Sequence, residues 1–199
     1  MMKRLFSALA LALVATLTLA GCGTDDASTS AGGSGLTSSH NEADLTFAQS
    51  MIPHHEQAVL MAKMATANAS TTQLKELAST IEAAQGPEIE TMGGWLKEWG
   101  EDVPSGNGGM DHDMGSMGDM PGMMSDDDMS KLDDSHGVAF DRMFLTMMVK
   151  HHTGAIEMAR TEQSDGQNAE AVALAKKIEA DQTAEIATMQ GLLSALPSS

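Results

Sequence analysis

The sequence predicts an all-α protein, an antiparallel four-helix bundle built from two copies of one helical hairpin. Apolar residues recur at steps of three and four along four long stretches, which is the period of an amphipathic helix. No stretch has the pattern of a strand. The second half of the chain repeats the first at a spacing of 97 residues without a gap. Two such hairpins with short turns are expected to pack as four antiparallel helices.

The first 21 residues are interpreted as a bacterial lipoprotein signal peptide. Lys3 and Arg4 precede an apolar run over residues 5–20, which is too short for a stable membrane span and is closely followed by small and polar residues. The end of this run, Leu19-Ala20-Gly21-Cys22, resembles a lipobox, a signal in which the cysteine is lipidated and becomes the mature N-terminus. We therefore expect a lipid anchor on the extracytoplasmic face of the cell membrane. The alternative is an ordinary secretory signal with a chance cysteine.

The composition limits both the kinds of site that the chain could form and the kinds of partner that it could bind. Cys22 is the only cysteine, so its lipidation would leave no thiol for disulfides or for cysteine-based zinc and redox sites. Without residues 1–21 the chain has nine basic and 28 acidic residues, a net charge of −19. That charge disfavours nucleic acid and anionic lipid as partners and favours cations. Residues 22–40 are rich in Gly, Ser and Thr and are expected to form a flexible tether.

The folded domain is expected over residues 41–197, and its first hairpin over residues 42–100. The first helix, over 45–67, carries a stripe of residues spaced by three and four, and Pro53 is expected to kink it. After a turn near residue 69, the second helix follows over 74–99, with a distortion at Gly86-Pro87. Its stripe is apolar except for Gln85 and Glu88. These two polar residues stand where apolar ones are expected.

Residues 104–135 connect the hairpins and have a different character. Between residues 106 and 130 the chain has seven methionines and six aspartates. Such a segment cannot bury itself, and it is expected to be disordered. A plain solvated linker is the alternative, but linkers seldom use methionine, whose apolar side chain has no reason to face water.

The second hairpin is expected over residues 137–196, with helices over 138–162 and 169–196 and a turn at Asp165-Gly166. Both copies carry the string M-x-x-H-H-x-x-A-x-x-M-A, which begins at Met51 and again at Met148. Folding each hairpin about its turn brings the first Met and His level with a Gln and a Glu, which are Gln85 and Glu88 in the first copy. Each hairpin is thus predicted to hold one polar layer. Whether the two layers form one site or two is left open by the sequence.

Thioether and imidazole groups together suit copper, above all Cu(I), whereas zinc rarely uses methionine. A carboxylate bonded to an imidazole N–H fixes its tautomer, and this role is predicted for Glu88 and Glu185, with Gln85 and Gln182 in the same layers. Two alternatives remain. The histidines could be inert core residues of a structural or partner-binding helical module. A ferritin-type oxidase is disfavoured because no Glu has a His three residues on.

The duplicated H-H-x-x-A-x-x-M-A hairpin resembles the family known as domain of unknown function 305, over residues 42–196 apart from the connection. Members of that family resemble ferritin-like four-helix bundles, and they include a secreted copper-binding protein. The resemblance implies binding of copper or silver outside the cytoplasm, in metal tolerance. On that pattern the natural metal ligands are Met51, His54, His55, Met61, Met148, His151, His152 and Met158.

We therefore expect a lipid-anchored, extracytoplasmic protein that is not an enzyme. It is expected to sequester Cu(I), or Ag(I) in its place, or to exchange it with a copper donor or acceptor protein. The connection is predicted to add weak Cu(I) capacity through the auxiliary ligands Met110, His112, Met114, Met117, Met120, Met123 and Met124.

Overall fold

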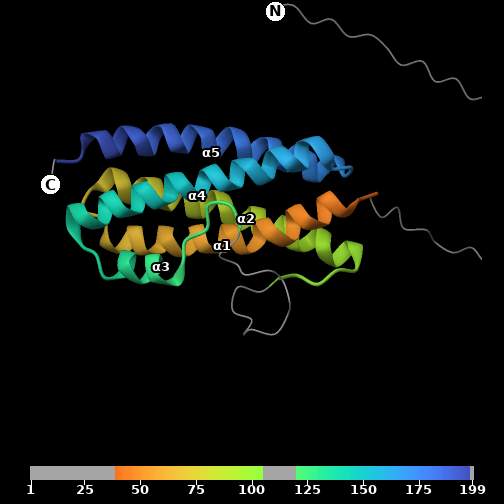
Figure 1. The fold of residues 1–199 in the computed structure, drawn as a ribbon, viewed down its shortest axis with the longest axis horizontal. Helices are drawn as coiled ribbons and strands as arrows, with labels where there is room; N and C mark the ends of the chain where they lie inside the picture. The colour runs from red at the N-terminus through yellow and green to blue at the C-terminus, as the bar shows by residue number, and fades with distance from the viewer. Residues whose placement is uncertain (1–38, 105–119, 198–199) are drawn as a thin grey trace, which may run out of the picture. The chain divides into compact units, whose positions relative to one another are not determined.

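The computed structural model describes residues 39–104 and 120–197 and confirms the predicted fold class. Within these ranges the chain is helical and has no strands. Figure 1 shows the long helices lying along one another, with a short helix α3 beside them. The helices are α1 (Glu42–Asn68), α2 (Thr72–Trp99), α3 (Asp126–Asp133), α4 (Gly137–Asp165) and α5 (Ala169–Ala195). The predicted signal peptide with Cys22, the tether up to residue 38, and the auxiliary ligands Met110, His112, Met114 and Met117 lie outside the described residues.

Side-chain caps set the beginnings of α1, α2 and α5, whereas α4 begins without one. Asn41 accepts hydrogen bonds from the backbone N–H groups of Ala43 and Asp44, and the Asp44 carboxylate accepts one from the N–H of Asn41. This reciprocal capping box occupies N–H groups that a helix start leaves unpaired. At the other end of the first hairpin, Gly100 stops α2 in the left-handed conformation with a φ of 83°. Both α1 and α2 continue as uninterrupted helices through their internal prolines, Pro53 and Pro87.

The two hairpins are fastened to each other by equivalent aspartates. Asp44, at the start of α1, accepts hydrogen bonds from the N–H groups of Gln167 and Asn168 in the α4–α5 turn, at 3.1 and 2.9 Å. Asp141, at the start of α4, accepts hydrogen bonds from the N–H and the hydroxyl of Ser70 in the α1–α2 turn. Both aspartates are fully buried. The start of each first helix therefore holds the turn of the other hairpin, which sets α1 and α4 antiparallel.

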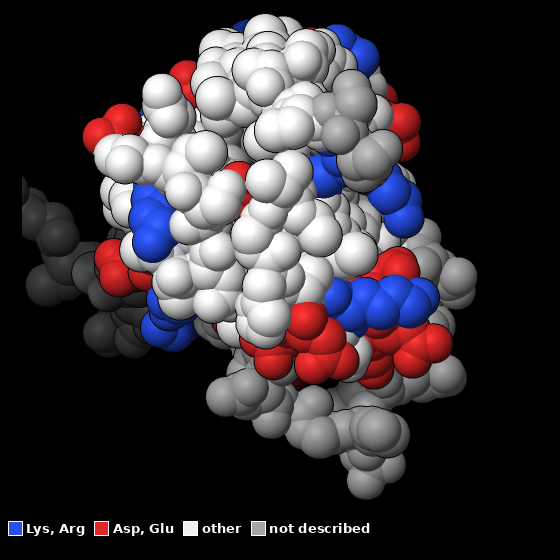
Figure 2. All heavy atoms as spheres, turned by 90° about the vertical axis from the view of Figure 1, so that its left-hand side faces the viewer, with Lys and Arg blue, Asp and Glu red and all other residues white. Residues whose placement is uncertain are grey.

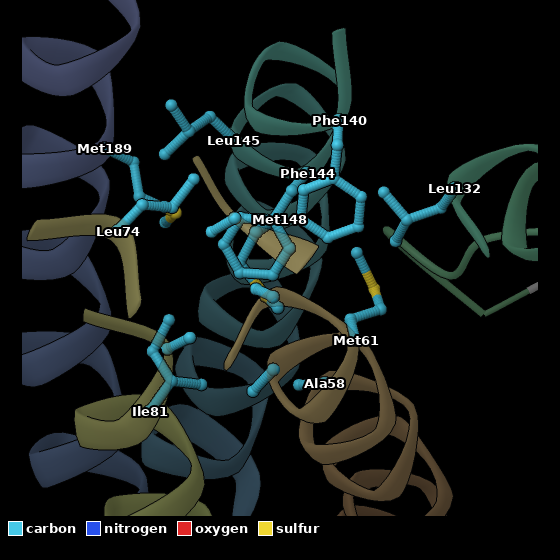
Figure 3. Close-up of a cluster of buried hydrophobic side chains, with 14 of the residues drawn as sticks. Ala58, Met61, Leu74, Ile81, Leu132, Phe140, Phe144, Leu145, Met148 and Met189 are labelled. Carbon is cyan, nitrogen blue, oxygen red and sulfur yellow. The ribbon is translucent and has the colours of Figure 1, made fainter. Parts of the chain in front are cut away.

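Two hydrophobic clusters lie on either side of a polar layer halfway along the bundle. The cluster in Figure 3 joins the second half of α1 to the first half of α4, and its largest side chains include Phe140, Phe144 and Met148. The other cluster joins the first half of α1 to the second half of α4 and includes Phe47 and Trp95. None of the described helices is long and apolar enough to cross a membrane.

The prediction of disorder in the connection is wrong from residue 120 onward. Residues 126–133 form α3, which packs against α4 and begins with Ser125 accepting a hydrogen bond from the N–H of Asp128. Three aspartates in its first turn favour a helix because they lie at the positive end of the helix dipole. Met124 and Leu132 supply buried apolar contacts. The acidic side chains in the lower part of Figure 2 lie at the end of the bundle where α3 is found.

Candidate metal centre

Four histidines form the polar layer halfway along the bundle. His54 and His55 come from α1, and His151 and His152 come from the equivalent turn of α4. All four are fully buried. The rings of His54 and His151 contact each other across the α1–α4 interface, with centroids 3.8 Å apart. The antiparallel packing of the two first helices therefore joins the two predicted polar layers into one.

The second histidine of each pair is bound to a carboxylate on the partner helix of its own hairpin. The Nε2–H of His55 donates to Glu88 at 2.9 Å, and the Nε2–H of His152 donates to Glu185 at 2.7 Å. Both glutamates belong to the predicted supporting set. The sequence placed His54 level with Glu88, and the structure shows that the neighbouring His55 makes the bond. Lys177 on α5 also donates to Glu88, at 2.9 Å, which adds a link between the hairpins.

These contacts favour neutral imidazoles and an ionised carboxylate. Burial, followed by the charge of the neighbouring His55, lowers the pKa of His54 to about 3. Burial also lowers the pKa of His55 and holds that of His151 well below the ordinary range. For Glu88, burial works against ionisation, but the hydrogen bonds from His55 and Lys177 outweigh it and lower the pKa. Uncharged imidazoles carry the lone pair that a metal ion needs.

A short segment of the connection covers the layer at His54. We call residues Met120–Met124 the strap. The carbonyl of Pro121 in the strap accepts a hydrogen bond from the Nε2–H of His54 at 3.0 Å. The side-chain amide of Gln57 accepts from the N–H of Met124 at 2.8 Å and donates to its carbonyl at 2.9 Å. The strap therefore lies against the same turn of α1 that carries the first His pair.

The acceptors fix the tautomers of three histidines. A carbonyl or carboxylate oxygen can only accept, so His54, His55 and His152 each hold their proton on Nε2. In a neutral ring the remaining nitrogen, Nδ1, then bears the lone pair. Within the described part of the chain, the Nδ1 atoms of these three rings are buried without a hydrogen-bond partner. These atoms are therefore the available electron-pair donors of the layer.

Further unpaired polar atoms accumulate in the same layer. Neither ring nitrogen of His151 makes a well-aligned hydrogen bond among the described residues, although a contact with the backbone of His54 works against the fall in its pKa. The side-chain amides of Gln85 and Gln182, which are 2% and 3% exposed, also have no hydrogen-bond partner there. A buried polar group without a partner costs about 1–3 kcal/mol, so native structures rarely concentrate such groups. A bound ion is one arrangement that would satisfy several of them together.

The comparisons with known proteins match this architecture. A profile of the Domain of unknown function (DUF305) family matches residues 44–193, which is most of the chain. The chain belongs to the DUF305 family. Similar solved structures include a DUF305 protein from Streptomyces coelicolor, described provisionally as secreted, with 32% identity over 76% of this chain and 92% of that chain and a TM-score of 0.68. A DUF305 fragment from Deinococcus radiodurans is 27% identical over 78% of this chain and 98% of that chain, with a TM-score of 0.69.

CopM is a further similar structure, and it has been solved with metal. Its Cu(II)-bound form is 32% identical over 76% of this chain and 95% of that chain, with a TM-score of 0.64. CopM has also been solved in Cu(I)-bound and Ag-bound forms. Among curated proteins, none matches this chain.

The methionines predicted as ligands in this DUF305 chain divide between the two hydrophobic clusters. Met61 and Met148 belong to one cluster, and Figure 3 shows the thioether of Met61 pointing toward Phe140 and Leu132. Met51 belongs to the other cluster, and Met158 packs against it while partly exposed. The methionines therefore flank the histidine layer on both sides. Among the described residues, no three His, Cys, Asp or Glu side chains form a ready metal-ligand group.

The auxiliary ligands that the structure describes lie in or beside the strap of this DUF305 chain. Met124 is 5% exposed and joins the cluster of Figure 3, whereas Met120 and Met123 are half-buried. Sequence reasoning missed the contribution of Gln57, Lys177 and the Pro121 carbonyl. Backbone carbonyls leave no signal in a sequence. Gln57 does leave one, because it differs from Gly154 at the equivalent position of the second copy.

Proposed function

We propose that the chain is an extracytoplasmic protein that holds one soft metal ion, Cu(I) or Ag(I), in the single histidine layer shared by its two hairpins. The accumulation of buried, unpaired nitrogens on four neighbouring histidines carries this proposal. Three rings hold a proton on Nε2 and are left to bind through Nδ1. His151 can bind through either nitrogen. Because no three of these side chains form a ready ligand group among the described residues, the rings would have to turn toward the ion on binding. The metal is cargo that the protein sequesters or transfers.

The choice of metal rests on the surroundings of the layer. No thiolate is available among the described residues, and methionines flank the imidazoles on both sides. Imidazole with thioether favours Cu(I) and Ag(I) over zinc. The copper-bound and silver-bound structures of CopM, a protein 29–32% identical to this chain, support the same choice. The excess of acidic residues over the whole chain would raise the local concentration of cations.

Attachment to the membrane through Cys22 belongs to the same proposal. The lipobox-like sequence Leu19-Ala20-Gly21-Cys22 supports it. A lipid at this cysteine would hold the bundle at the outer face of the cell membrane, where it would bind metal ions before they enter the cytoplasm. A transfer partner, if the metal is passed on, would be another extracytoplasmic copper-binding protein.

Thermal melting of the metal-free protein with added metal tests the proposal. Ag(I) and Cu(I) under reductant are expected to raise Tm, and Zn(II) is expected to raise it little. Binding to the folded state at a hundredfold excess over Kd stabilises it by about 2.7 kcal/mol, which corresponds to roughly 5–11 °C for a domain of this size. A variant with all four layer histidines replaced by alanine is expected to show no shift.

A matched control uses a histidine outside the layer. His136 is exposed and its side chain does not cap α4, so His136→Ala is expected to keep the whole metal-dependent shift. Equal shifts in the fourfold variant and in the parent protein would mean that the histidines are inert. The alternative of a structural or partner-binding helical module would then replace the proposal.

A further inference from the structure

The strap approaches the α4 backbone so closely that one position must be glycine. A Cβ built on Gly154 would lie 1.9 Å from the carbonyl oxygen of Pro121. That is far inside any real contact, so an alanine at 154 would push the strap away from α4. Gly122 in the strap is itself in the left-handed region, with a φ of 81°, and it lies against the carbonyls of Lys150 and His151.

Differences between the two repeats coincide with the strap. Gln57 and Gly154 occupy equivalent positions, 97 residues apart, and so do Pro53 and Lys150. Gln57 clamps the backbone of Met124, and Lys150 donates to the carbonyl of Met123 at 3.4 Å. Three of these four residues therefore contact the strap, within a helical string whose Met, His and Ala residues are otherwise repeated. The two copies therefore differ from each other at positions that contact the strap.

The strap supplies His54 with a hydrogen-bond acceptor, as the two glutamates do for the other histidines. His55 and His152 donate their Nε2–H to Glu88 and Glu185, and His54 donates its own to the Pro121 carbonyl. In metal sites such a partner fixes the ring orientation and the tautomer of a ligand, and its loss typically costs ten- to a hundredfold in affinity. Among the described residues His151 has neither a carboxylate nor a strap carbonyl as acceptor, and it contacts only the backbone of His54.

We propose that the strap is a positioning element of the metal site, in which the Pro121 carbonyl holds the Nε2 proton of His54 so that its Nδ1 faces the metal. Gln57 and Gly154 are positioning residues that hold the carbonyl there, the first by two hydrogen bonds and the second by leaving space. This proposal rests on the proposed function of the histidine layer. It assigns roles to residues that are not themselves ligands.

Imidazole ¹⁵N NMR of the metal-free protein tests the geometry independently of metal binding. In the parent protein His54, His55 and His152 are each expected to carry a proton on Nε2. In Gly154→Ala, the signals of His54 are expected to shift toward a mixture of tautomers while those of His55 and His152 stay unchanged. The unchanged signals and the helical circular dichroism also show that the variant is folded.

Ag(I) affinity, measured by competition with a chelator, tests the consequence. Gly154→Ala and Gln57→Leu are each expected to weaken binding about ten- to a hundredfold, and Gln57→Glu, which keeps an acceptor for the N–H of Met124, is expected to weaken it less. Thr153→Ala is the matched control. Thr153 is exposed, and its hydroxyl donates only to its own helix at Val149, so its affinity is expected to stay at the parental value.

Two results would overturn the proposal, and they are distinguishable. An unchanged His54 tautomer in both Gly154→Ala and Gln57→Leu would show that the strap does not orient the ring. An altered tautomer with unchanged Ag(I) affinity would show that orientation does not matter for binding. Absence of Ag(I) binding in the parent protein would instead refute the proposed function and leave the tautomer result intact.

Discussion

Replacing His151 and His152 separately by leucine is expected to change the stability of the metal-free protein in opposite directions. Leucine is close to histidine in volume, so both changes keep the packing of the layer nearly constant. The two residues are adjacent on α4 and both are fully buried. They differ in their hydrogen bonds, because His152 donates to Glu185 whereas His151 makes no well-aligned hydrogen bond in the described structure.

The magnitudes follow from that difference. A buried polar group without a partner costs about 1–3 kcal/mol, so His151→Leu is expected to raise the unfolding free energy by roughly 1–2 kcal/mol after some loss in fit. His152→Leu removes a hydrogen bond to a carboxylate, which contributes about 1.5–3 kcal/mol. At roughly 2–4 °C per kcal/mol for a domain of this size, the two variants should move Tm by several degrees in opposite directions.

Thermal melting with a chelator, followed by melting with Ag(I), measures both effects. Each variant is expected to lose most of the metal-dependent shift, although only His152→Leu is less stable without metal. This combination is expected if His151 is needed for metal binding although it lowers the stability of the metal-free protein. The reasoning is refuted if His151→Leu destabilises the metal-free protein as much as His152→Leu does, since His151 would then contribute to the fold itself.

Further predictions concern the carboxylates and the anchor. Burial, and then the adjacent Asp44, raises the pKa of Glu162 to about 8, so the folded state holds this proton more tightly than the unfolded state. Stability should therefore fall as pH rises from about 4.5 to about 8. Glu162→Gln should flatten that part of a Tm-versus-pH curve. An unchanged slope in this variant would contradict the prediction. Asp44→Ala leaves the N–H groups of Gln167 and Asn168 without their acceptor and is expected to cost about 2–4 kcal/mol in urea unfolding, whereas Glu42→Ala, at an exposed neighbour, should cost little. Cys22→Ser is expected to move the protein from the membrane to the soluble extracytoplasmic fraction, and identical fractionation of mutant and parent would rule out the lipid anchor.

The fold could be predicted because the determining signals are periodic. Helical spacing, the gapless repeat and the polar turn residues together specify four helices and two hairpins, and the structure confirms them. The pairing of Glu88 and Glu185 with histidines could also be predicted. The two helices of a hairpin are antiparallel, so residues at equal distances from the turn lie opposite each other. Counting from the turn put Glu88 level with His54, whereas it binds His55.

What could not be predicted depends on contacts between the hairpins and on the backbone. The meeting of His54 with His151 follows from the way α1 crosses α4, and that is set by the buried Asp44 and Asp141 rather than by any local pattern. The order of residues 120–135 was missed because composition describes a segment alone, whereas Met124 and Leu132 are buried by a bundle already formed. Every residue has a backbone carbonyl, so the sequence does not indicate that the carbonyl of Pro121 accepts a hydrogen bond from His54.

The number of tight Cu(I) ions bound by three proteins tests the shared histidine layer most directly. The parent protein, the His54→Ala/His55→Ala variant and the His151→Ala/His152→Ala variant would be titrated against a Cu(I) chelator that masks weak thioether sites. Because the rings of His54 and His151 are in contact, either double variant is expected to lose the whole high-affinity binding event. Loss of half the tightly bound copper in each variant would mean two independent sites, and no loss in either would mean that the histidine layer does not bind copper.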